Sequence, residues 1–93
     1  MKWREFPHDK LPLVLKAKAG EAIAIPLPVK VADVEGNKLG TDNPAVTPQL
    51  DTVNGGAVVV IRSERAVKAR VSWEVTDSTG RRFTKNGQAV EFD

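Results

Sequence analysis

The stretch that decides the fold is Ala66-Val-Lys-Ala-Arg-Val-Ser-Trp-Glu-Val-Thr76. Its apolar residues fall at every second position from Val67 to Val75, and polar residues fill the positions between them. A period of two is typical of a β-strand with one buried face and one wet face, whereas a helix would scatter these valines around its circumference. We therefore predict a strand over residues 66–76 with Trp73 on its buried face.

The segments that follow predict two more strands. Asp77-Ser-Thr-Gly80 has the composition of a type I turn with a bulge, and Asn86-Gly87 fits a two-residue type I′ turn. We therefore expect return strands over Arg81–Lys85 and Gln88–Phe92. The same apolar-x-apolar-x-Asp-x-x-Gly-x-x-apolar pattern occurs over Val29–Leu39. Either a shared turn chemistry or a duplicated half-domain would produce this second hairpin pattern.

The rest of the chain also favours strands. It has thirteen valines but only six leucines, and β-branched side chains fit a pleated surface better than a helix. Alternation predicts strands over Leu13–Lys18 and Ala22–Ile25, and Ala57–Arg62 is typical of a central strand covered on both faces. Pro26 and Pro28 cannot donate to a ladder, so we expect that segment to lie at a sheet edge or to cross between sheets.

Seven or eight short strands at this spacing predict an all-β fold, an antiparallel β-sandwich. The two Asp-x-x-Gly hairpin patterns and Trp73 on an alternating strand resemble an immunoglobulin-like β-sandwich, of the kind found on phage particles and bacterial surface proteins. Antibody-type domains add paired cysteines and a tyrosine corner, but this chain has no cysteine and no tyrosine. We expect a single sandwich domain over residues 13–93, preceded by an N-terminal arm over residues 1–12.

Composition excludes several classes of protein. Without cysteine there are no disulfides, thiolate nucleophiles or cysteine metal sites, and a single histidine, His8, excludes a multi-histidine centre. The longest apolar run is Ala57–Ile61, whereas a membrane helix needs about 20 residues. The N-terminus has no hydrophobic stretch like that of a signal peptide. We expect cytoplasmic synthesis, a virion as one destination, no membrane association and no cofactor.

Catalytic and metal chemistry have weak candidates. His8-Asp9 is the only histidine–carboxylate pair along the sequence, and a base of this kind needs a nucleophile such as Ser63, Ser72 or Ser78. We expect His8 to be solvent-exposed in the arm and the protein not to be an enzyme. The acidic residues that could suggest a calcium site are explained as turn formers, so we expect no metal site; they are Asp33, Glu35, Asp42 and Asp51.

Basic residues form the first candidate partner-binding group. Lys68 and Arg70 share the polar face of the predicted strand, and Arg81 and Arg82 lie across the following turn. Paired strands would bring several of these cations together, where they could bind phosphate, an acidic protein patch or another copy of the chain. The alternatives are a solvated face and a nucleic-acid surface, and the latter usually adds stacking aromatics.

Aromatic residues in the N-terminal arm form the second candidate group. Trp3 and Phe6 are too apolar to be left in water, but their neighbours are too polar to enter a core. The two rings either fold back to plug one end of the sandwich or dock on a neighbour as buried anchors. We predict that they rest on another subunit or partner.

These observations predict a non-enzymatic structural or protein-interaction module, for example a phage virion accessory or decoration protein. The alternative is a small inhibitor or adaptor that docks on a larger protein. A third hypothesis is a nucleic-acid-binding small β-barrel. A protein partner or a homo-oligomer is expected, and nucleic acid is the less favoured partner.

Overall fold

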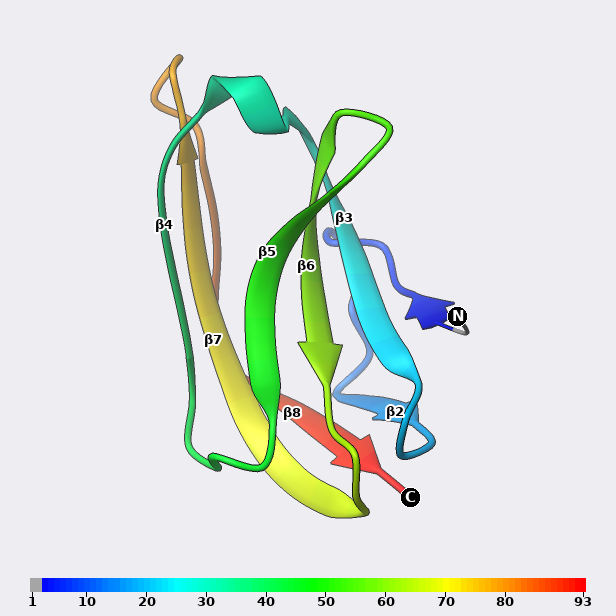
Figure 1. Cartoon of the computed structure of the whole chain (residues 1–93). Helices are drawn as coiled ribbons and strands as arrows, with labels where there is room; N and C mark the ends of the chain where they lie inside the picture. The colour runs from blue at the N-terminus through cyan, green and yellow to red at the C-terminus, as the bar shows by residue number, and fades with distance from the viewer. Residues whose placement is uncertain (1–2) are drawn as a thin grey trace.

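The computed structural model describes residues 3–93 and shows two four-stranded sheets packed face to face (Figure 1). In spatial order, the first sheet consists of β1 (Trp3–Glu5), β3 (Ala22–Lys30), β6 (Gly56–Arg62) and β5 (Thr47–Val53). The second consists of β2 (Val14–Ala17), β8 (Arg82–Phe92), β7 (Val67–Asp77) and β4 (Val34–Thr41). A single 3₁₀ turn, η1 (Val31–Asp33), joins β3 to β4, and residues 3–93 contain no α-helix. The predicted all-β, immunoglobulin-like sandwich is confirmed, with eight strands.

The core forms where the alternating strand predicts it. Val71, Trp73 and Val75 of β7 point inward and pack in one cluster with Val59 and Ile61 of β6. Strand β6 is buried on both faces, since every residue from Ala57 to Ile61 is buried. The prediction of a central covered strand is therefore confirmed.

Most strand pairs are antiparallel, but β1 pairs with β3 and β2 pairs with β8 in parallel. Strand β1 reaches only residues 22–24 of β3. Pro26 and Pro28 therefore lie where β3 has β6 as its one neighbouring strand, and the ladder is irregular between Pro26 and Lys30. The prolines sit at a local sheet edge, as predicted from their missing N–H groups.

The predicted turn at Asn86-Gly87 is wrong. Strand β8 runs unbroken through it, and the ladder between β7 and β8 shifts register between Val71 and Trp73. Gly87 has a φ of +68° and its N–H donates to the Ser72 hydroxyl oxygen over 2.9 Å. A glycine with positive φ serves a β-bulge as well as a turn, so the dipeptide alone could not distinguish the two.

The predicted hairpin at Asp33 is also wrong. Strand β3 belongs to the first sheet and β4 to the second, so η1 carries the chain across the sandwich rather than back along one sheet. Only the later pattern, at Asp77–Gly80, forms a hairpin, between β7 and β8. The repeated Asp-x-x-Gly pattern therefore marks two different connections.

The N-terminal stretch packs on the chain's own sandwich instead of standing apart as an arm. Trp3 covers a second apolar cluster on the outer face of the first sheet, formed by Ala22, Ala24, Val58 and Val60. Phe6 packs against the main core, and its N–H donates to the Ala24 carbonyl oxygen over 2.9 Å. Both rings therefore have contacts within the chain but stay partly exposed, and their docking on another subunit or partner stays a prediction.

Replacing Trp73 with alanine should lower the free energy of unfolding by about 3–5 kcal/mol, because it removes a large side chain from the centre of the core. Chemical denaturation checks this. A loss below about 1 kcal/mol would mean that the ring contributes little to core packing.

Replacing Trp3 with alanine should cost about 1–2 kcal/mol, because a half-buried ring leaves the outer cluster of the first sheet. The matched control is Leu13→Ala, since the Leu13 side chain is 93% exposed and its loss should change stability by less than about 0.5 kcal/mol. Equal effects of the two substitutions in urea titrations would show that β1 does not cover the sheet in solution.

Candidate functional site

Three connections gather at one end of the sandwich (Figure 1). They are η1 between the sheets, the turn at residues 54–55 between β5 and β6, and the turn at residues 78–81 between β7 and β8. We call these three segments, with the flanking Val53, the loop end. In Ig-like sandwiches such connections are the variable surface that a rigid scaffold presents.

Hydrogen bonds tie η1 to both neighbouring turns. The Val31 N–H donates to the Gly55 carbonyl oxygen over 2.9 Å, and the Ser78 N–H donates to the Asp33 carbonyl oxygen over 2.9 Å. The β5–β6 turn itself is tight, with positive φ values of 52° at Asn54 and 82° at Gly55. These values fit a type I′ turn, for which Asn-Gly is the preferred sequence. The three connections therefore form one bonded unit.

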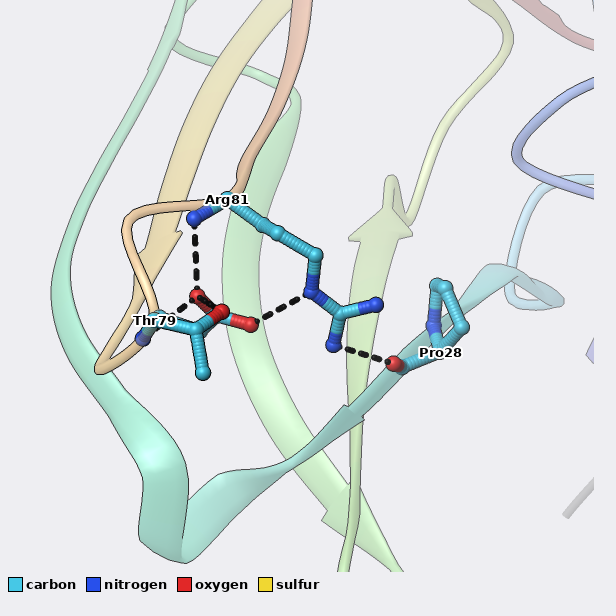
Figure 2. Close-up of polar contacts among 4 residues, drawn as sticks. Pro28, Thr79 and Arg81 are labelled. Atoms are coloured by element: carbon cyan, nitrogen blue, oxygen red, sulfur yellow. Dashed lines mark hydrogen bonds and ion pairs between the residues drawn. The ribbon is translucent and has the colours of Figure 1, made fainter.

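The Asp77 carboxylate holds the third connection in place. Asp77 is the last residue of β7 and only 2% of it is exposed. One carboxylate oxygen accepts hydrogen bonds from the Thr79 N–H at 3.0 Å, the Thr79 hydroxyl at 2.8 Å and the Arg81 N–H at 2.9 Å. The other oxygen accepts from Arg81 Nε at 2.8 Å (Figure 2). One side chain thus accepts four hydrogen bonds from two residues of the turn, Thr79 and Arg81.

Arg81 also links the turn to the opposite sheet. Its guanidinium donates from Nη2 to the Pro28 carbonyl oxygen of β3 over 3.2 Å, as Figure 2 shows. Since Pro28 lies where β3 lacks a second neighbouring strand, this carbonyl can accept from a side chain. The chain of contacts from Asp77 through Arg81 to Pro28 therefore clamps the two sheets together at the loop end.

These contacts shift the ionisation of Asp77. Burial alone would raise the pKa of the carboxyl group, but hydrogen bonds from Thr79 and Arg81 to the carboxylate outweigh burial and lower the pKa to about 2. The carboxylate is therefore charged throughout the physiological pH range, and the turn keeps its central acceptor.

The loop end also exposes apolar side chains. Of the three large hydrophobic residues that are exposed in the described chain, Val31 (40%) and Val53 (39%) lie here, and the third is Leu13. A shallow groove of about 490 Å³ runs beside them, lined by residues 27–30 and 54–56. A larger groove of about 550 Å³, lined by residues 44, 45, 47 and 62–65, includes none of these exposed side chains. The loop end is therefore the better candidate for a protein contact.

The basic residues predicted to form one patch are separated. Lys68 and Arg70 lie opposite Glu91 and Ala89 in the ladder, whereas Arg82 lies opposite Thr76, six residues further along β7. At about 3.3 Å per residue this places Arg82 roughly 20 Å from Arg70 along the strand. The fourth residue, Arg81, is engaged with Asp77 and Pro28. Arg82 and Arg81 are therefore set apart from Lys68 and Arg70, and the four cations do not form one cluster.

The other candidate residues have structural contacts. His8 packs edge-on against Phe83 with 5.7 Å between ring centroids. The Ser63 hydroxyl donates to the Arg65 carbonyl oxygen, and the Ser72 hydroxyl accepts from Gly87. None of these contacts joins His8 to a serine.

Two of the acidic residues make contacts other than the expected turn contacts, since Asp51 lies within β5 and Asp42 bonds a residue 28 positions away. The Asp42 carboxylate accepts from the Arg70 N–H at 2.8 Å, and the Asp51 carboxylate accepts from the Thr52 N–H at 2.9 Å. Across residues 3–93, no three His, Asp or Glu side chains are grouped so that they could hold a metal ion. Nor does any helix in this part of the chain have the length and apolarity to cross a bilayer.

Comparison with known proteins gives a likeness in structure alone. No protein-family model matches the chain, and no curated protein matches it. The crystal structure of the cysteine protease inhibitor EhICP2 from Entamoeba histolytica is similar, with a TM-score of 0.56 and 8% sequence identity. The likeness covers 99% of this chain and 96% of that chain. At this identity it shows a shared fold.

No pattern in the sequence alone indicated the loop end as a site. The Asp-x-x-Gly pattern predicted a turn after Asp77, but it did not connect Asp77 with Arg81 or with Val31 and Val53. The available signal was an aspartate that ends a buried strand and is followed four residues later by arginine. The grouping of Val31 with Val53 depends on strand order, which the sequence did not supply.

The Asp77 carboxylate should stabilise the fold in a pH-dependent way. Its pKa is lowered in the folded state, so its contribution is present above the ordinary value of 3.8 and is lost as pH falls toward about 2. The thermal midpoint of the wild type should exceed that of Asp77→Asn by a constant amount near neutral pH, and this difference should shrink between about pH 4 and pH 2.

The matched control for this experiment is Asp33→Asn, which removes an exposed carboxylate from the same end of the molecule. This variant should unfold like the wild type across the range. A wild type no more stable than Asp77→Asn at neutral pH would contradict the assigned role of the carboxylate.

Proposed function

We propose that this chain is a non-enzymatic protein-interaction module that acts as a small inhibitor, docking on a larger protein with its loop end. One observation carries the proposal. The three connections are bonded to one another while Val31 and Val53 remain exposed between them. A surface that is both fixed and apolar is suited to contact with another protein.

Rigidity favours tight docking. Binding costs free energy when loops must be ordered at the interface, and loops already fixed in the free protein avoid much of that cost. Here the fixing groups are the Asp77 carboxylate, Arg81 and the two backbone bonds of η1. Protease–inhibitor complexes typically show this behaviour, with little backbone movement on association.

The size of the loop end is adequate for such a contact. The domain measures 38 × 26 × 23 Å, and its strands run along the long direction (Figure 1). The end therefore presents a cross-section of 26 × 23 Å, or about 600 Å². A standard interface buries about 800 Å² on each partner. The side chains that project from the loop end and the adjoining groove would supply the area that the flat cross-section lacks.

The fold likeness to a cysteine protease inhibitor makes cysteine proteases the first partners to test. The virion interpretation rests on the sequence resemblance, and no contact in the structure favours it specifically. The nucleic-acid hypothesis required clustered cations on a small barrel, whereas the basic residues are dispersed over a two-sheet sandwich.

The wild-type chain should slow peptide hydrolysis by papain or a related cysteine protease, measured with a fluorogenic substrate. Val31→Glu and Val53→Glu should each raise the inhibition constant by at least about tenfold, because each places a charge in an apolar contact. Leu13→Glu is the matched control, since it makes the same kind of change at an exposed position outside the loop end.

Two results would count against the proposal. Absence of inhibition by the wild type across a panel of cysteine proteases would remove this partner class. Equal loss of inhibition in Leu13→Glu and the two loop-end variants would show that docking does not use the loop end.

A further inference from the structure

The sandwich leaves four outer strands, and β4 differs from the other three. As described, β1 has three residues, β2 has four, and β5 contains Pro48. Strand β4 has eight residues without proline, and residues 35–38 are all exposed. Short length and proline are two ways in which proteins prevent a sheet edge from pairing with another chain. Strand β4 lacks both, and it carries two other such devices, a bulge at Glu35 and the charge of Lys38.

We propose that β4 is a self-association edge, which pairs antiparallel with β4 of a second copy of this chain. Such a contact joins the second sheets of two molecules into one continuous sheet around a two-fold axis. It uses a different surface from the loop end, so it neither requires the proposed inhibitor function nor follows from it.

The ladder with β7 defines the available register. Five residues of β4 each lie opposite one residue of β7, and Glu35 is the extra residue of a bulge. In order along β4, the five are Val34, Gly36, Asn37, Lys38 and Leu39, opposite Asp77, Thr76, Val75, Glu74 and Trp73 of β7. These levels are symmetric about Asn37. A two-fold axis through Asn37 therefore sets Val34 against Leu39 of the second copy and the Glu35–Gly36 step against Lys38 of the second copy.

This register sets apolar side chains against apolar ones and charged side chains against opposite charges. Val34 and Leu39 are both partly buried and pack against the core, so their juxtaposition extends an apolar row across the contact. Glu35 and Lys38 are the only charged residues of β4, and the symmetry brings each against its opposite twice. Opposite charges across paired strands stabilise the pairing by roughly 0.2–1 kcal/mol for each pair.

The same charges disfavour the neighbouring registers. A two-fold axis through Lys38 would set the Lys38 side chains of the two copies against each other. A two-fold axis through Gly36 would place Lys38 beyond the end of β4 in the second copy, so that it has no opposite charge there. A shift by one level would turn apolar side chains to the polar face. The pairing of charges and the need to keep apolar side chains on one face therefore select one register. Specific interfaces likewise combine attraction to the right partner with repulsion of wrong arrangements.

An edge of six to eight residues buries less surface than a standard interface, so the dimer should be weak and reversible. Sedimentation equilibrium of the wild-type chain up to about 1 mM should show mass rising from 10.1 kDa toward twice that value. Glu35→Lys and Lys38→Glu should each raise the dimer dissociation constant by about tenfold or more, because each sets like charges together at two places.

The double variant, Glu35→Lys with Lys38→Glu, restores opposite charges and should return the dissociation constant to within about threefold of wild type. Lys85→Glu on β8 is the control, since it changes net charge equally at an exposed site away from β4. Thermal unfolding of each variant verifies that it is folded. A wild type that stays at 10.1 kDa up to about 1 mM would overturn the proposal. So would a dimer that both single variants leave unchanged, or one that the double variant fails to restore.

Discussion

The buried carboxylate of Asp77 is the interaction on which the proposed binding end depends. It ends strand β7, accepts four hydrogen bonds and fixes Arg81 so that the guanidinium reaches Pro28 on the other sheet. A buried charge is costly unless its hydrogen-bonding capacity is filled, so this arrangement tolerates few alternative loop conformations. The apolar core stabilises the sandwich as a whole, whereas Asp77 fixes the conformation of the turn between β7 and β8 at the loop end.

Local sequence rules predicted much of the fold. The alternation around Trp73 identified β7 and its buried face, and the apolar run before Arg62 identified the covered strand β6. Two predictions failed for one physical reason. Asn-Gly and Asp-x-x-Gly describe only how the backbone bends locally, and the same bend serves a turn, a bulge or a crossing between sheets. Which of these forms depends on strand pairing far away in the sequence.

The candidate site could be predicted less well, because it depends on long-range placement. Arg82 is close to Lys68 and Arg70 in the sequence, but the length of β7 separates it from them in space. Val31 and Val53 are far apart in the sequence, but the order of strands brings them to the same end. Trp3 provides a third example, since its partners Val58 and Val60 could not be identified without the pairing of β1 with β3.

The central claim is that the loop end is rigid before any partner binds, and native-state hydrogen exchange of the free protein tests it most directly. The N–H groups of Thr79 and Arg81 donate to the Asp77 carboxylate, and that of Ser78 donates to Asp33. These amides belong to an exposed turn, where exchange is ordinarily fast. The account predicts that all three are protected nearly as well as amides in β7. Exchange at the rate of an unstructured peptide would contradict it.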